Sequence, residues 1–165
     1  MAYYVDACLA VSIPTAAGRL FVGVPMLRRP ASAPTIDHLG WAVRSIDSAR
    51  PHFEAGLGLD MQSDERFPDV RVAFFGIGPS RVELLEPLVA ESDLSRFIAR
   101  RGEGLHHLAL RVDDVAAALD EAPSRGFRQI DKAPRPGARG TLVGVVDPQR
   151  EDGVLVQYVQ APMTA

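Results

Sequence analysis

Two histidines, in two segments of similar sequence, are the side chains best suited to chemistry in this chain. One lies in residues 36–43 (IDHLGWAV) and the other in residues 105–112 (LHHLALRV). When the segments are aligned, His38 falls on His107, and the apolar residues that follow them also coincide. The second half of the chain therefore reads as a copy of the first. A pair of modules related by a pseudo-twofold axis can bring matching side chains to one central cleft.

A carboxylate and an amide form a second matched pair in the two halves. Glu83 interrupts an apolar segment (VELL), and Gln157 occupies the equivalent place in a later one (VLVQYV). Imidazole nitrogens with carboxylate or amide oxygens suit a borderline or hard divalent ion, such as Co²⁺, Ni²⁺, Mn²⁺, Fe²⁺, Zn²⁺ or Mg²⁺. Such an ion can hold a substrate oxygen and polarise a carbonyl group. The sequence therefore predicts a metal site formed by His38, Glu83, His107 and Gln157.

Each of these residues also has a purely structural interpretation. A single histidine in a strand is often a satisfied core residue, and Glu83 could serve only to bind a neighbouring side chain. A carboxylate among apolar neighbours needs a partner in either case, and the repetition of the histidine favours the metal site. His106 has the opposite strand parity from His107, so we expect it to face the helix layer and to be structural or to support a ligand.

The strand predicted at residues 36–43 positions the first histidine. Strict alternation along this strand separates a face of small residues, which includes the histidine, from a bulkier face that should pack on a helix. The small face leaves room for another group beside the imidazole. The two sets are Ile36, His38, Gly40 and Ala42 on one face and Leu39, Trp41 and Val43 on the other.

Capping residues, prolines and apolar periodicity predict the remaining elements. The first module, residues 35–90, should contain a helix and further strands, and a linking helix should connect it to the second module, residues 104–160. The predicted elements are a helix that begins after Ser45 or Asp47 and is disturbed by Pro51, strands at 70–75 and 81–85, the linking helix at 92–101, a helix from Asp114 that bends or ends at Pro123, and strands at 141–146 and 153–159.

We expect a single domain at residues 35–160, preceded by an N-terminal extension or arm at residues 1–34. In the extension, two short apolar runs are broken by glycine and proline, and the first charged residue is Asp6. A signal peptide would need a basic start, so this interpretation is disfavoured. The extension could be an added strand or arm, or it could precede a second start at Met26.

Composition and charge exclude several classes of function. The chain has 165 residues, a net charge of −3 and a sequence pI of about 5.8, so neither nucleic acid nor an anionic membrane is expected as a partner. No apolar run approaches the roughly 20 residues that span a bilayer. The lone Cys8 excludes an intramolecular disulfide framework and suits a cytoplasmic location.

Four motifs, in the same order, resemble methylmalonyl-CoA epimerase, a member of the vicinal oxygen chelate (glyoxalase/bleomycin resistance) superfamily. They are residues 36–43, 82–87 (VELLEP), 101–109 (RGEGLHHLA) and 134–138 (PRPGA), and the similarity covers about residues 36–160. The resemblance implies an α+β fold in which paired βαβββ modules form a half-open, barrel-like sheet around a metal cleft, with helices on the outer face. It also implies a divalent metal ion as cofactor and a homodimer.

The resemblance assigns the metal ligands to His38, Glu83, His107 and the position of Gln157. The epimerases usually have glutamate at that last position, where it is both a ligand and a catalytic base. The amide of Gln157 can coordinate through its oxygen, but it cannot take a proton at neutral pH. Glu83 is then the only carboxylate of the set, and we assign it as a ligand and as the candidate catalytic base.

Three functions are compatible with these residues. The first is a metal-dependent epimerase or isomerase that acts through an enolate on a small-molecule substrate of the 2-acyl-CoA thioester type, as the resemblance implies. The second is a glyoxalase-type isomerase or lyase on another small carbonyl compound, with Glu83 as its single base. The third is a non-catalytic binding or resistance protein for a small molecule. An iron dioxygenase is disfavoured, because in those relatives the carboxylate ligand stands at the position of Gln157.

Overall fold

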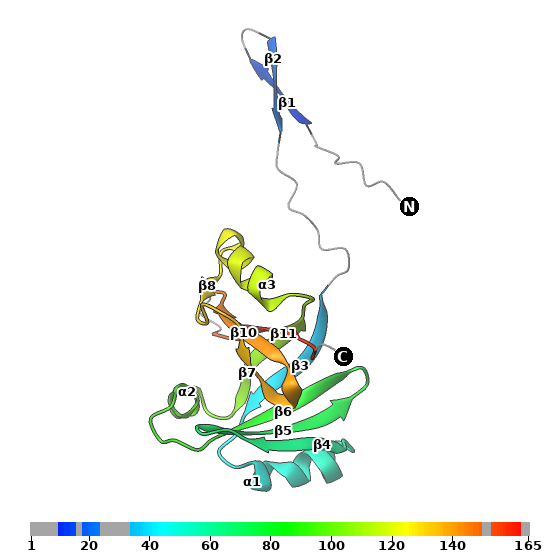
Figure 1. Cartoon of the computed structure of the whole chain (residues 1–165), viewed down its shortest axis with the longest axis vertical. Helices are drawn as coiled ribbons and strands as arrows, with labels where there is room; N and C mark the ends of the chain where they lie inside the picture. The colour runs from blue at the N-terminus through cyan, green and yellow to red at the C-terminus, as the bar shows by residue number, and fades with distance from the viewer. Residues whose placement is uncertain (1–9, 16–17, 24–33, 150–152, 163–165) are drawn as a thin grey trace. The chain divides into compact units, whose positions relative to one another are not determined.

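The computed structural model describes residues 10–15, 18–23, 34–149 and 153–162 of the chain (Figure 1). The chain divides into two compact units, Met1–Ala33 and Pro34–Ala165. In the first unit, β1 (Ala10–Thr15) and β2 (Gly18–Gly23) form an antiparallel pair. The segment predicted as an extension or arm contains this hairpin, and the rest of that segment, apart from Pro34, lies outside the described residues.

The second unit consists of two modules joined by a helix (Figure 1). The first module contains β3 (Thr35–Ala42), α1 (Ile46–Pro51), the π-helix η1 (His52–Gly56), β4 (Met61–Arg66), β5 (Val70–Ile77) and β6 (Ser80–Pro87). The linking helix is α2 (Asp93–Arg101). The second module contains β7 (Gly104–Arg111), α3 (Val115–Glu121), the 3₁₀-helix η2 (Ala122–Arg125), β8 (Arg128–Gln129), β9 (Arg135–Pro136), the 3₁₀-helix η3 (Ala138–Gly140), β10 (Leu142–Asp147) and β11 (Leu155–Gln160). None of the helices in the described residues is long and apolar enough to cross a membrane.

The strands of both modules form one mixed sheet. Among the described residues it has nine strands in the order β4-β5-β6-β3-β7-β11-β10-β8, with β9 paired to β10. β3 and β7 are antiparallel neighbours at the centre, and each has a parallel partner on its other side, β6 and β11 respectively. From its outer edge to the centre, each half of the sheet therefore has the strands of its module in the same relative order, as expected of a duplicated module. The path ends at β4 and β8, so the sheet is open, and the predicted α+β fold of paired modules is confirmed.

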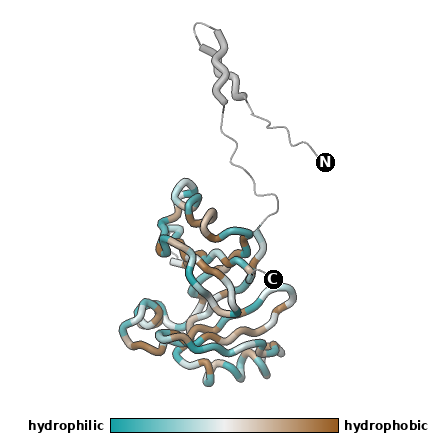
Figure 2. The backbone as a smooth tube through the Cα atoms, in the orientation of Figure 1, coloured by the Kyte–Doolittle hydropathy of each residue, from teal (hydrophilic) through white to brown (hydrophobic). Residues whose placement is uncertain are grey.

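Each module has its own apolar core between its helix and the outer face of the sheet. Ser45 caps α1 by accepting a hydrogen bond from the backbone N–H of Ser48 at 3.3 Å, and Asp114 caps α3 in the same way. Along the strands the hydropathy changes from residue to residue (Figure 2), as expected of strands with one face on a core. The two cores consist of Val43, Ile46, Phe53, Ala73, Phe75, Val82 and Leu84 under α1, and of Val115, Leu119, Ala122, Val146 and Tyr158 under α3.

Two local features differ from the expectations drawn from the sequence. β4 has the polar sequence MQSDER, which does not predict a strand, but as an edge strand it turns only every second residue inwards. Trp41 belongs to the bulky face that was expected to pack on a helix, yet it is 39% exposed, whereas Val43 does join the first core. The expected disturbance at Pro51 is present, because α1 ends there and the chain continues as the π-helix η1.

Candidate metal centre

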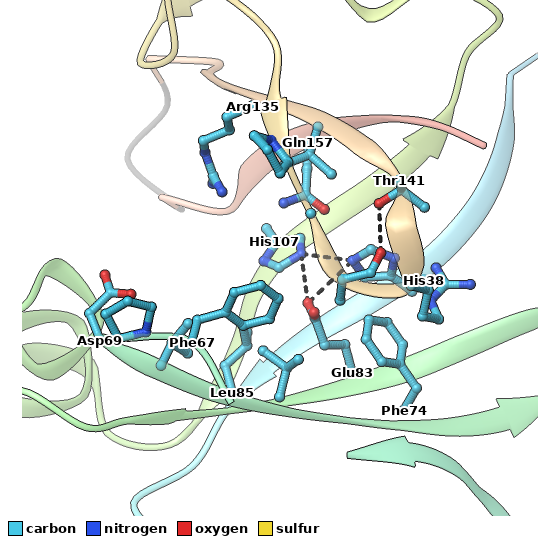
Figure 3. Close-up of a pocket in the computed structure, with 18 residues that line it drawn as sticks. His38, Phe67, Asp69, Phe74, Glu83, Leu85, His107, Arg135, Thr141 and Gln157 are labelled. Carbon is cyan, nitrogen blue, oxygen red and sulfur yellow. Dashed lines mark hydrogen bonds and ion pairs between the residues drawn. The ribbon is translucent and has the colours of Figure 1, made fainter. Parts of the chain in front are cut away.

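The four residues predicted as metal ligands come together at the centre of the sheet (Figure 3). His38 lies on β3, Glu83 on β6, His107 on β7 and Gln157 on β11, and all four line one cavity of about 220 Å³. His38, Glu83 and His107 are almost completely buried, with exposed fractions of 3%, 6% and 4%. Each of the four central strands therefore contributes one of these side chains.

The strand register arranges the four residues around two small ones in a symmetric way. β6 pairs in parallel with the outer edge of β3, and β11 pairs in parallel with the outer edge of β7. Gly40 on β3 and Ala109 on β7 therefore each have a candidate ligand on both neighbouring strands. Gly40 pairs with Glu83 and with His107, and Ala109 pairs with His38 and with Gln157.

Gly40 leaves the space that the imidazole of His107 occupies. A Cβ atom on Gly40 would lie 2.1 Å from Cε1 and 2.3 Å from Nδ1 of His107, far inside ordinary van der Waals contact at about 3.5–4.0 Å. The face of β3 that carries small residues therefore leaves the predicted space, and the imidazole of His107 occupies that space.

The ligand atoms of three residues are spaced as a single ion would hold them. Nε2 of His38 lies 3.1 Å from Nε2 of His107, and Oε2 of Glu83 lies 3.3 Å from each of these nitrogens. Atoms bound to one ion at about 2.1 Å, with angles of about 90° to 110°, are roughly 3.0–3.4 Å apart. The two imidazoles and the carboxylate therefore fit a divalent ion.

Gln157 lines the same cavity but is not one of these three closely spaced groups. Its side chain extends from β11 towards the two histidines (Figure 3). An amide oxygen is a neutral ligand, weaker for a hard cation than a carboxylate. Its role as the fourth ligand stays a prediction.

Interactions with the two histidines keep Glu83 ionised. Burial alone would raise the pKa of Glu83, but its close contacts with Nε2 of His107 and His38 outweigh burial and lower the pKa to about 2. Burial alone would lower the pKa of His38, but hydrogen bonds to Asp37 and Glu83 outweigh it and raise the pKa. Glu83 therefore provides the negative charge that a buried cation at this point requires.

Asp37 is a buried carboxylate beside the site, and the sequence did not predict its role. It is 3% exposed, and its Oδ1 accepts a hydrogen bond from Nδ1 of His38 at 2.9 Å. Arg111 and Arg139 donate to the same carboxylate at 2.7 Å and 2.8 Å. Burial raises the pKa of Asp37, but these hydrogen bonds from His38 and Arg111, with the charge of Arg139, hold it well below its usual range. Its position next to a candidate ligand is the signal that could have indicated a supporting role.

Arg139 also lines the cavity, and two other charged residues line it at a distance from the closely spaced ligands (Figure 3). Asp69 lies in the turn between β4 and β5, and Arg135 lies on β9. Asp69 was not predicted as a site residue, because a turn carboxylate has no sequence pattern that distinguishes it from a solvated one. In the folded chain it lines the same cavity as Glu83.

Residues 37–145 match the family described as the Glyoxalase/Bleomycin resistance protein/Dioxygenase superfamily. The matched segment spans more than half of the chain and includes His38, Glu83 and His107. The chain belongs to this superfamily. The predicted membership of the vicinal oxygen chelate superfamily is therefore confirmed.

The sequence relatives include epimerases of CoA thioesters. The chain is 30% identical over 129 residues to the ethylmalonyl-CoA/methylmalonyl-CoA epimerase of Cereibacter sphaeroides, which covers 76% of this chain and 96% of the relative. It is 38% identical over 127 residues to YqjC, an uncharacterized protein of Bacillus subtilis (strain 168), covering 76% of this chain and 91% of that protein. The relatives thus include proteins with an assigned reaction and proteins without one.

Solved structures share the fold. A variant of Streptomyces coelicolor methylmalonyl-CoA epimerase in complex with 2-nitronate-propionyl-CoA superposes with a TM-score of 0.74 at 30% identity, over 81% of this chain and 98% of that one. A hypothetical protein from Bacillus halodurans C-125 superposes with a TM-score of 0.75 at 38% identity, over 81% and 99% of the two chains. The open sheet described above is therefore the fold of this superfamily.

Proposed function

We propose that the chain is a metal-dependent isomerase of the methylmalonyl-CoA epimerase type, acting on a 2-acyl-CoA thioester. The observation that carries this proposal is the cluster of His38, Glu83 and His107, whose ligand atoms lie 3.1–3.3 Å apart in the wall of one cavity. Relatives named as epimerases, at about 30% identity, support the same reaction class. The propionyl-CoA analogue bound to one structural neighbour supports a CoA thioester as the substrate class.

The two imidazoles and the carboxylate would hold the ion, and Gln157 would add a neutral oxygen. When bound, a divalent ion polarises the thioester carbonyl and stabilises the negative charge that develops on its oxygen. The cavity, at about 220 Å³, is smaller than the roughly 300–1,000 Å³ of pockets that enclose a whole ligand. It therefore suits the short acyl group, while the rest of the CoA moiety would lie outside.

Glu83 is the proposed base that removes the proton from carbon 2 of the acyl group. Its pKa, lowered to about 2 by the two histidines, keeps the carboxylate ionised at neutral pH, which a base requires. Both of its contacts with the histidines are made by Oε2, so Oε1 is not needed to hold the cluster together. Removal of the proton leaves an enolate, and return of a proton to the opposite face inverts the carbon.

Inversion also requires a proton donor on the other face of that carbon. The amide of Gln157 cannot fill this role at neutral pH. Asp69 is the other carboxylate among the described residues that line the cavity. We therefore propose Asp69 for the second proton transfer, made directly or through a water molecule.

The amide at Gln157 also favours a second candidate, a glyoxalase-type isomerase or lyase that uses Glu83 alone. A reaction that moves a proton along one face of its substrate needs only one base. This candidate shares the metal centre and differs in its substrate, which would be another small carbonyl compound. A non-catalytic binding protein would hold a ligand in the same cavity without turnover.

Exchange of the proton on carbon 2 of methylmalonyl-CoA in D₂O, followed by ¹H NMR, tests the proposal. The metal-loaded wild type should exchange this proton, and Glu83→Gln should slow exchange by about 10²–10⁴-fold, the usual contribution of a general base. Gln157→Glu should keep or raise the rate, and Gln149→Glu, at an exposed turn residue, is its matched control. Full-rate exchange in Glu83→Gln would contradict the assignment of the base. A metal-loaded wild type that does not exchange this proton but turns over another small carbonyl compound would favour the second candidate.

A homodimer, a cytoplasmic location and the separation of residues 1–34 from the domain at 35–160 stay predictions. Ile36, Trp41 and Leu105 are large apolar side chains on the two central strands, and each is at least 36% exposed. Exposed apolar side chains of this kind support an interface with another chain. Light scattering tests the dimer, and a monomer mass at micromolar concentration would contradict it.

A further inference from the structure

A β-bulge precedes each of the two histidines of the metal centre. In the pairing of β3 with β7, one unpaired residue is inserted on each strand, Asp37 on β3 and His106 on β7. Each inserted residue stands immediately before a histidine of the cluster, so the two bulges occupy equivalent positions in the two modules. Bulges re-aim side chains and are common next to active sites.

Each inserted residue contacts Nδ1 of the histidine that follows it. Oδ1 of Asp37 lies 2.9 Å from Nδ1 of His38, and Nδ1 of His106 lies 3.1 Å from Nδ1 of His107. In a regular strand, neighbouring side chains point to opposite faces and do not meet in this way. The bulges therefore convert two pairs of sequence neighbours into two pairs of hydrogen-bond partners.

We infer that Asp37 and His106 are positioning residues that fix the tautomer and the orientation of His38 and His107. This inference rests on the metal site of the proposed function. A neutral imidazole carries one N–H, and the nitrogen that binds an ion must carry none. A hydrogen-bond acceptor beside Nδ1 favours the tautomer in which Nδ1 carries the single N–H of the imidazole. Nε2, which faces Glu83 in both histidines, is then free as the ligand atom.

Asp37 is the more strongly held of the two acceptors. An ionised carboxylate only accepts hydrogen bonds, so Nδ1 of His38 must be the donor. Arg111 donates to Asp37 from β7 at 2.7 Å and Arg139 from η3 at 2.8 Å, and the guanidinium of Arg139 also lies 4.5 Å from the ring centre of Phe74. Both arginines belong to the second module. Through Asp37, the second module therefore helps to orient His38 of the first module.

His106 is a neutral and therefore weaker acceptor for His107. Its ring packs edge-on against Phe97 of α2, with ring centres 4.9 Å apart and an interplanar angle of 83°, which fixes its orientation. If Nδ1 of His106 accepts, its own N–H must lie on Nε2. Hydrogen bonds to a charged acceptor are roughly twice as strong as those to a neutral one. The orientation of His38 is therefore more strongly stabilised than that of His107.

The tautomers can be read directly in the wild-type chain. Long-range ¹H–¹⁵N correlation spectra of the full chain loaded with Zn²⁺ should show the N–H of His38 and His107 on Nδ1, and that of His106 on Nε2. An N–H on Nε2 of either ligand, or on Nδ1 of His106, would overturn the inference. This measurement needs no substitution, so it decides the matter even if a variant fails to fold.

The affinity for Zn²⁺, measured by competition with a chelating dye, supplies the second test. Asp37→Asn should weaken binding by about 10–100-fold, the usual effect of losing an outer hydrogen-bond partner, and His106→Phe should weaken it by less. His106→Gln keeps an oxygen acceptor and should recover most of the loss. Asp64→Asn and His52→Phe, at exposed positions away from the cavity, should leave the affinity unchanged.

Two outcomes of this titration separate the inference from the proposed function. Unchanged affinity in both Asp37→Asn and His106→Phe would overturn the positioning roles and leave the metal site intact. A wild type that binds no Zn²⁺ would overturn the metal site itself, and the positioning roles with it.

Discussion

Gly40→Ala should displace His107 from the metal centre while leaving the fold in place. The added Cβ would lie 2.1 Å from Cε1 of the imidazole, whereas non-bonded carbon atoms settle at about 3.5–4.0 Å. The ring must therefore retreat by about 1.4 Å or more. The clash is with a side chain rather than with backbone, so the ring can move, but its contact with Glu83 at 3.3 Å would be lost.

A displacement of this size is large on the scale of metal coordination. Ligand distances tolerate only about ±0.2 Å, so His107 would cease to be a ligand. Because losing a supporting residue alone costs about 10–100-fold in affinity, losing a ligand should weaken binding by at least about 100-fold. That factor corresponds to about 2.7 kcal/mol. The overpacked centre should also lower the free energy of unfolding of the metal-free chain by about 1–3 kcal/mol.

Competition with a chelating dye measures the first effect, and urea unfolding of the metal-free protein measures the second. Gly56→Ala is the matched control, because its Cβ would meet the nearest atom, on His52, at an ordinary contact distance of 3.4 Å. The control should bind the ion as the wild type does. A Gly40→Ala chain with wild-type affinity would refute the reasoning, because His107 would then not need the space beside Gly40.

Two further predictions concern protons. The affinity for the ion should fall as the pH is lowered between about 8 and 5, because a proton on Nε2 of His38 competes with the ion. The pKa of His38 is raised, so the fall should begin at a higher pH than for an ordinary histidine and approach about tenfold per pH unit below that pKa; a pH-independent affinity would contradict this. Asp69→Asn should slow the inversion of methylmalonyl-CoA by about 10²–10⁴-fold while proton exchange through Glu83 continues. Asp60→Asn, at an exposed residue, is the control, and normal inversion in Asp69→Asn would exclude Asp69 as the second acid–base group.

The candidate ligands could be predicted from the sequence because they repeat. The same short pattern around His38 and His107 gives matching places in two modules, and the central antiparallel pair β3–β7 follows from that symmetry. Glu83 was recognisable because a charged residue stood in an otherwise apolar strand. The helices were predictable for local reasons, since Ser45 and Asp114 cap them as expected.

The contacts of the supporting residues could not be predicted, because they depend on how the two central strands pair. His106 was expected to be structural or to support a ligand, whereas Asp37 was missed. Strict alternation puts Asp37 and His106 on the face away from the next histidine, and one unpaired residue on each strand reverses that placement. No local sequence signal marks these bulges. Trp41 illustrates the same limit, since its apolar character predicts packing on a helix, but α1 packs on β5 and β6. Such features are set by tertiary pairing rather than by the pattern of one segment.

The number of divalent ions bound per chain tests the proposed metal centre most directly. The full chain would be loaded with Zn²⁺, freed of excess ion, and analysed by elemental mass spectrometry against protein concentration. We expect one ion per wild-type chain and none in a chain that carries both His38→Ala and His107→Ala. A wild type that retains no ion, or a double variant that retains one, would contradict the assignment of His38, Glu83 and His107 as the ligands.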